Sequence, residues 1–159
     1  MNWSSWLLWG FLANIILTMA SSATEALGLT RLNYPYVLGS LFTPDRDRAR
    51  LYGLFIHLGF GWLFSLIYIA IFQSLGAAGW WRGMVIGIFH AFFVLIVIMG
   101  VLPGIHPRMA SERHGPEAAN MLEPPGFLAL NYGARTPLAV ILSHAIFGAI
   151  LGAFYHLKR

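Results

Sequence analysis

Four long apolar runs dominate this chain and limit the folds open to it. They cover about residues 3–27, 51–73, 80–102 and 138–157. A run of about 20 apolar residues is long enough to cross the hydrocarbon core of a bilayer as a helix. Only 10% of the 159 residues are charged, against roughly 25% in soluble proteins. We therefore predict one all-α integral membrane domain over residues 1–159, with four transmembrane helices.

Several other classes of protein are disfavoured by the same sequence. The first apolar run is predicted to be a retained helix, because no Lys or Arg precedes it and it is too long for a signal-peptide core. The chain has no cysteine, which excludes disulfides, thiolate metal sites and cysteine nucleophiles. Its net charge of +4 comes from bases at the ends of apolar runs, so nucleic-acid binding is not expected. Phosphate-loop, zinc-peptidase and serine-hydrolase motifs are absent, which favours a protein without its own catalysis.

The basic residues are divided unequally between the two sides of the predicted bundle. Four spans place residues 28–50 and 103–137 on one side, with both chain ends and the turn at 74–79 on the other. Seven bases fall on the first side and three on the second: Arg31, Arg46, Arg48, Arg50, Arg108, Arg113 and Arg135 against Arg82, Lys158 and Arg159. By the positive-inside rule we predict a cell-membrane protein, of a bacterial inner membrane, with cytoplasmic long loops and external termini.

Two of the runs contain matching segments. His57 begins the sequence HLGFGWLFSLIY, and His144 begins HAIFGAILGAFY, with His, Phe, Gly and Tyr at equal offsets. We interpret the match as an internal repeat, with one unit at about 1–76 and the other at about 77–159. Because each unit holds two helices, both would enter the membrane in the same direction. The fold predicted is two tandem, parallel-repeated helical hairpins, with a long, proline-rich, ordered loop between helices 3 and 4.

Small residues recur at helical spacing in three of the spans. At 100° per residue they form one stripe on each helix, where they let two backbones approach closely. We predict these stripes to be helix-packing surfaces, and their members are Gly61 and Ser65, Gly83 and Gly87, and Gly148 and Gly152.

Each span also contributes one titratable side chain: Glu25, His57, His90 and His144. An ionisable group within a membrane span is costly and marks a functional site by default. Three interpretations stay open. Neutral imidazoles can hydrogen-bond across helices and fix their register. His57 and His144 can ligate haem b, or all four residues a transition metal such as zinc, iron or copper. The same groups can also relay protons.

The leading functional prediction is a non-catalytic accessory or assembly subunit of a larger membrane complex. Its partners would be the lipid bilayer and other membrane subunits, or further copies of the same chain. The small-residue stripes and the lack of reaction motifs favour this interpretation. The alternatives are a haem- or metal-binding redox protein that uses the buried histidines, and a small proton-coupled transporter that acts as an oligomer.

Overall fold

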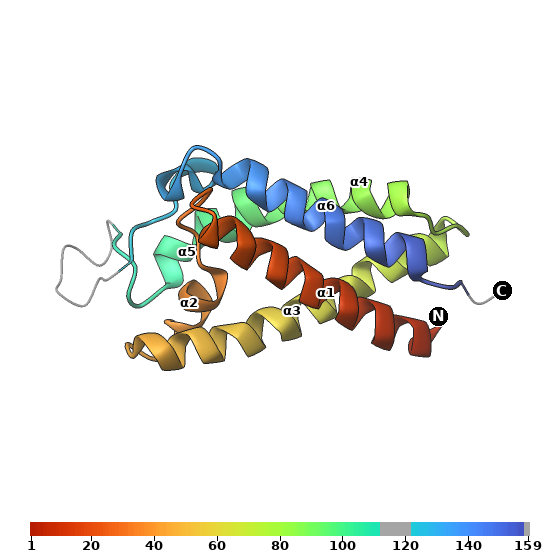
Figure 1. Cartoon of the computed structure of the whole chain (residues 1–159), viewed down its shortest axis with the longest axis horizontal. Coiled ribbons are helices and arrows are strands. Elements are labelled where there is room, and N and C mark those ends of the chain that lie inside the picture. Colours follow the sequence, from red (N-terminus) through yellow and green to blue (C-terminus); the bar gives the residue numbers. More distant parts are fainter. Residues whose placement is uncertain (112–121, 158–159) are drawn as a thin grey trace.

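The computed structural model describes residues 1–111 and 122–157 and is helical throughout its regular parts (Figure 1). Four helices in this part of the chain are long and apolar enough to cross a membrane, which confirms the predicted all-α, four-span organisation. They are α1 (Trp3–Ala26), α3 (Arg46–Ser74), the third span at Trp80–Ile105, and α6 (Thr136–Phe154). Arg113, Lys158 and Arg159, three of the bases behind the predicted orientation, lie outside the described residues.

The spans pack side by side in the order α3, α1, α6, α4 (Figure 1). Helix α1 lies between α3 and α6, and α4 makes its main contact with α6. Both chain ends and the turn at 75–79 lie at one end of the bundle, which we call the termini side. The opposite end, the loop side, is formed by residues 27–45, 106–111 and 122–135. A short helix there, α2 (Tyr34–Gly39), packs closely on α3.

Helix α3 begins five residues before its apolar run, because a capping residue precedes it. The Asp45 carboxylate accepts a hydrogen bond from the Arg48 N–H at 2.8 Å, which satisfies a free donor of the first turn. The first turns of α3 are therefore polar, and only the later turns are apolar enough for lipid. Asn2 caps α1 in the same way, with its side chain accepting from the Ser5 N–H at 3.2 Å.

The third span is not a uniform α-helix. It comprises α4 (Trp80–Phe93), a π-helical turn η1 (Val94–Ile98) and α5 (Met99–Ile105). Pro103 lies inside α5, where it removes one backbone donor. Single π-helical turns inside α-helices are frequent at functional sites, and this one begins four residues after His90.

Two hydrophobic cores fill the interior of the bundle. The loop-side core joins α2, the third span, the following segments and α6, and the termini-side core joins α1, α3 and α6. The loop-side core consists of Leu32, Tyr34, Val37, Ala91, Leu95, Met99, Leu102, Met109, Leu122, Ala129, Tyr132 and Val140. The termini-side core consists of Ala13, Leu17, Tyr68, Ile69, Phe72, Phe147, Leu151 and Tyr155.

The described parts of the long loop between the third span and α6 fold back onto the bundle. A 3-10 turn, η2 (Phe127–Tyr132), ends in Tyr132, whose hydroxyl donates to the Glu123 carbonyl at 2.7 Å. Arg31 joins this loop to the α1–α2 connection through an ion pair with Glu123 at 3.2 Å. Residues 112–121 of this loop lie outside the described residues. The internal repeat stays a prediction: each proposed hairpin packs as a pair, but no finding tests its origin by duplication.

Candidate functional site

Three of the four predicted titratable residues lie near one another inside the bundle, and two of them are in direct contact. His57 comes from α3, His90 from α4 and His144 from α6. The rings of His90 and His144 meet edge to face, with centroids 4.8 Å apart and an interplanar angle of 83°. His57 lies within electrostatic range of both other imidazoles. We call these three residues the histidine cluster.

His144 is the most buried member of the cluster, with 4% of its surface exposed. Its Nδ1 lies 2.9 Å from the Val140 carbonyl, one helical turn earlier. A carbonyl can only accept, so Nδ1 carries the hydrogen and Nε2 keeps a lone pair in the neutral ring. His144 therefore presents a basic nitrogen to the interior and not a donor.

The tautomer of His57 follows from the hydroxyl beside it. Thr18 Oγ1 lies 2.9 Å from the Asn14 carbonyl and donates its single hydrogen there. It must therefore accept from Nδ1–H of His57, 3.0 Å away, which leaves Nε2 of His57 with the lone pair. The ring also stacks on Tyr34 of α2, with centroids 5.5 Å apart. His57 and His144 thus share one tautomer, although different groups fix it.

His90 lies deepest along its helix and is surrounded by aromatic rings. Its Nδ1 is 3.0 Å from the Tyr68 hydroxyl. Phe64 stacks on the imidazole, with centroids 4.8 Å apart and planes inclined by 20°. His90 is therefore tied to α3 by one hydrogen bond and to α6 by its contact with His144.

Glu25 lies apart from the cluster. Both of its carboxylate oxygens accept from the Asn33 side-chain amide, at 2.9 and 2.8 Å. The Asn33 oxygen in turn accepts from the Tyr36 N–H at 2.8 Å and caps α2. Glu25 thus fixes the end of α1 to the start of α2 on the loop side.

The described residues do not form the predicted metal site. No three His, Asp or Glu side chains among them group in a way that would hold a metal ion. A haem does not fit between α3 and α6 as they pack here. Tyr68 and Phe147 fill that space, nearly without exposure, in an edge-to-face contact of 5.2 Å. The residues present therefore fit neither a haem nor a transition metal.

The small residues of the third and fourth spans form one seam between α4 and α6. A Cβ added at Gly83 would lie 1.8 Å from the Gly148 carbonyl oxygen. A Cβ added at Gly87 would lie 2.2 Å from the His144 carbonyl oxygen. Gly152 meets the Gly79 carbonyl in the same manner, at 2.3 Å. These glycines place the backbones of α4 and α6 in direct contact. The seam thereby also sets the separation of His90 and His144.

The stripe of α3 faces α1. A Cβ on Gly61 would lie 2.1 Å from the Asn14 side-chain oxygen. Asn14 is fully buried, and its amide nitrogen donates to the Leu58 carbonyl. The Ser65 hydroxyl accepts from the Trp6 indole N–H at 2.7 Å. All six predicted packing residues therefore face other helices of the same chain, and none is left to face a separate subunit.

Sequence reasoning missed several interior polar partners. Thr18 and Tyr34, which flank His57, did not stand out from their surroundings. The spacing of Asn14 and Thr18, four residues apart in an apolar run, places both on one helical face and could have indicated a polar partner for α3. Tyr34 lies in a segment predicted to be a loop, so its burial carried no signal.

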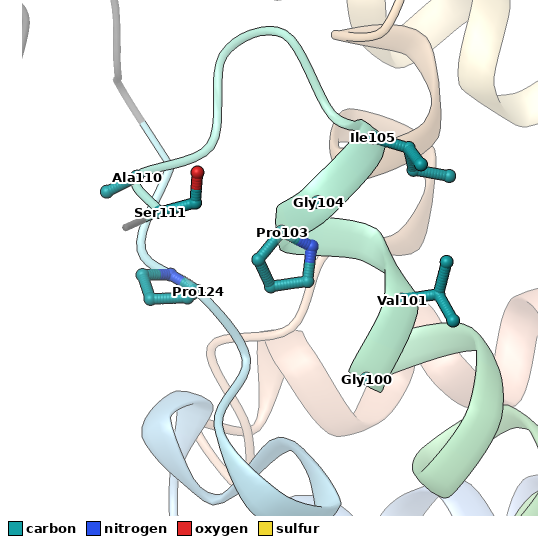
Figure 2. Close-up of a pocket in the computed structure, with 8 residues that line it drawn as sticks. All are labelled: Gly100, Val101, Pro103, Gly104, Ile105, Ala110, Ser111 and Pro124. Atoms are coloured by element: carbon teal, nitrogen blue, oxygen red, sulfur yellow. The ribbon is translucent and has the colours of Figure 1, made fainter. Parts of the chain in front are cut away.

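A concave region lies at the loop-side end of α5, apart from the histidine cluster (Figure 2). Its volume is about 530 Å³, and it is bounded by the last turns of α5 and by the segments on either side of residues 112–121. Aliphatic side chains and backbone make up most of the lining, with the Ser111 hydroxyl also present (Figure 2). No histidine lines it, so it does not extend the histidine cluster.

No match was found for this chain among protein-family models, curated proteins or solved structures.

Proposed function

We propose that this protein transfers protons within the membrane, alone or coupled to a solute, through the histidine cluster. The observation that carries the proposal is the grouping of three imidazoles from three helices, with His90 and His144 in contact and His57 within electrostatic range of both. Ionisable side chains in membrane spans mark proton and substrate paths. Imidazole suits this role because its ordinary pKa lies close to physiological pH.

The hydrogen bonds of the cluster leave its basic atoms available. Nε2 of His57 and of His144 keep their lone pairs, because Nδ1–H is already donated in each ring. Each ring can accept a proton at Nε2 without breaking its existing hydrogen bond. His90 and its Tyr68 partner extend the chain of polar groups toward the bilayer centre.

Polar groups also occur at the termini side, but an apolar barrier separates them from the cluster. Tyr155 accepts there from the Gln73 amide and from the Asn2 backbone N–H, each at 3.0 Å. Phe72 and Leu151 of the termini-side core lie fully buried among the same helices. The path is closed on this side, so we propose that transfer requires a rearrangement of the termini-side core.

Proton flux into proteoliposomes tests the proposal directly. An imposed pH difference and an entrapped pH-sensitive dye should report faster equilibration with protein than in protein-free vesicles. The His57→Ala/His144→Ala double variant should lose this flux, whereas His156→Ala, outside the spans, should keep it. Circular dichroism establishes that both variants are folded. Equal flux in the double variant and the wild type, or no flux above that of empty vesicles, would refute the proposal.

A second candidate function is the accessory or assembly subunit. Helix α3 favours it, because only 22% of its most apolar 18 residues are buried in the bundle, against 44% for α6. Phe55, Phe60 and Leu63 are among its exposed residues. A partner helix could cover this surface in place of lipid. Extraction of the tagged protein from native membranes should then yield a stoichiometric partner, and a monomer without a partner would argue against it.

We propose that the loop side faces the cytoplasm of a cell membrane, on the distribution of basic residues. The absence of cysteine makes this simple to test, since one introduced thiol is the only thiol in the protein. Ser74 and Ala134 are exposed, on the termini side and the loop side respectively. A membrane-impermeant maleimide should label Ser74→Cys in intact cells and Ala134→Cys only after lysis. The opposite pattern would reverse the orientation.

A further inference from the structure

A small, partly open cavity lies between α1, the segment that follows it, and α6, next to the histidine cluster. Its volume is about 10 Å³, close to the minimum that admits one water molecule. Five hydroxyl-bearing residues contribute to its lining: Ser21, Thr24, Thr30, Tyr34 and Ser143. These side chains bring hydroxyl groups to the cavity, although most of its lined surface is apolar.

The hydroxyl hydrogens of the helical serines and threonine are already used. Ser21 Oγ donates to the Leu17 carbonyl at 2.9 Å, and Thr24 Oγ1 donates to the Ser21 carbonyl at 2.8 Å. Ser143 Oγ donates to the Ala139 carbonyl at 2.8 Å. A hydroxyl has one hydrogen and two lone pairs, so these three oxygens can offer only lone pairs to a further partner. An occupant of the cavity must therefore be able to donate.

Tyr34 differs from the other four hydroxyl residues. Only 8% of its surface is exposed, and no protein group among the described residues hydrogen-bonds its buried hydroxyl. Burial raises the pKa of Tyr34 above its ordinary value, so the hydroxyl keeps its hydrogen and can donate. Leaving a buried hydroxyl without a partner costs about 1–3 kcal/mol, which favours an occupant that accepts as well as donates.

We infer that this cavity binds one ordered water molecule, which accepts from the Tyr34 hydroxyl and donates to hydroxyl oxygens of α1 and α6. Water alone among common occupants of this size both accepts and donates. A bound cation would lack a counter-charge, because no carboxylate lines the cavity and Glu25 is paired with Asn33.

The position of this water relates it to the histidine cluster. The Tyr34 ring stacks on His57, and the carbonyl that takes Nδ1–H of His144 belongs to Val140, which also lines the cavity. The water would join the cluster to the loop side. The water site itself is independent of proton transfer, whereas this role in a path rests on the proposed function.

The sign of one stability change tests the water site. If the Tyr34 hydroxyl has no partner, Tyr34→Phe removes an unsatisfied group and should raise the Tm. If a water accepts its hydrogen bond, the same change should lower the Tm by about 2–4 °C. Tyr52→Phe, at an exposed position of α3, is the matched control and should leave the Tm unchanged.

An experimental structure at a resolution that shows ordered water provides the second measurement. We expect density for one water within hydrogen-bonding distance of Tyr34 Oη in the wild type, and its loss or displacement in Tyr34→Phe. A Tm for Tyr34→Phe that is unchanged or raised, or a wild-type cavity without such density, would overturn the inference. Neither readout involves proton flux. A water that is present in a protein without flux would therefore refute only the proposed function.

Discussion

Any side chain at Gly83 should disturb the seam between α4 and α6. An added Cβ would lie 1.8 Å from the Gly148 carbonyl oxygen, although ordinary contacts begin at 3.4 Å. Because both contacting groups are backbone, no side chain can rotate away, and the two helices must separate by more than 1 Å. Overpacking of this kind costs about 1–3 kcal/mol. Alanine regains about 0.5–1 kcal/mol as the better helix former, so Gly83→Ala should destabilise the protein by up to about 2.5 kcal/mol net.

Gly59 provides the matched control for this prediction. It also lies inside a helix long and apolar enough to cross a membrane, but a Cβ there would meet nothing within 4 Å. Gly59→Ala should therefore stabilise the protein by about 0.5–1 kcal/mol, through helix propensity alone. Both variants can be unfolded by SDS in mixed micelles and followed by circular dichroism, which gives the free energy of unfolding. If Gly83→Ala is as stable as Gly59→Ala, the backbones of α4 and α6 do not approach as closely at Gly83 as described here.

Three further predictions concern individual hydrogen bonds. Trp6→Phe removes the indole donor to Ser65 and should lower the free energy of unfolding by about 1 kcal/mol in the same assay. Tyr68→Phe removes the hydroxyl partner of His90 and should reduce proton flux, with folding unchanged by circular dichroism; unaltered flux would place Tyr68 outside the path. Burial lowers the pKa of His106, so its contribution to stability is present above about pH 6.5 and is lost as the pH falls toward the lowered value. His106→Gln should therefore flatten the fall of the Tm between about pH 6.5 and pH 5, and an unchanged slope would refute this assignment.

The pH prediction follows from the hydrogen bonds of His106. Its Nε2 lies 3.0 Å from the Val37 carbonyl and therefore carries the hydrogen. Its Nδ1 accepts from the Arg108 N–H at 3.1 Å. A proton added to Nδ1 would break the second bond and place a buried charge near the Arg108 guanidinium. The neutral ring is thus part of the fold, because it joins the end of the third span to α2.

The four helices long and apolar enough to cross a membrane could be predicted from sequence, because a bilayer imposes a length and a composition on any helix that crosses it. The ends of the helices could not, since they depend on local groups outside the apolar runs. Asp45 caps α3, so the helix begins five residues before its apolar run. The π-helical turn after His90 has no counterpart in the hydrophobic pattern, which reads as one continuous run.

Sequence reasoning found the histidines but not their partners. Depth in a helix follows from counting residues, so His57 and His144 could be placed at similar levels. The rotation of each helix about its axis decides which side chain it meets, and packing sets that rotation. His57 therefore bonds to Thr18 of another helix, whereas His144, at the matching position, bonds to its own helix. Equal sequence offsets did not produce equal contacts.

The close packing of α4 on α6 also determines the contact between two imidazoles of the histidine cluster. Gly87 lies against the His144 carbonyl and is three residues before His90, so one close approach of backbones holds the two imidazoles in edge contact. A larger residue at Gly87 would separate the helices and the rings together. A larger residue at Gly152, farther along the same seam, would also separate the helices, but at a point distant from the two rings. If the histidine cluster transfers protons, Gly87→Ala should therefore lose more flux than Gly152→Ala at equal loss of stability, because only the first change acts directly on the contact between His90 and His144.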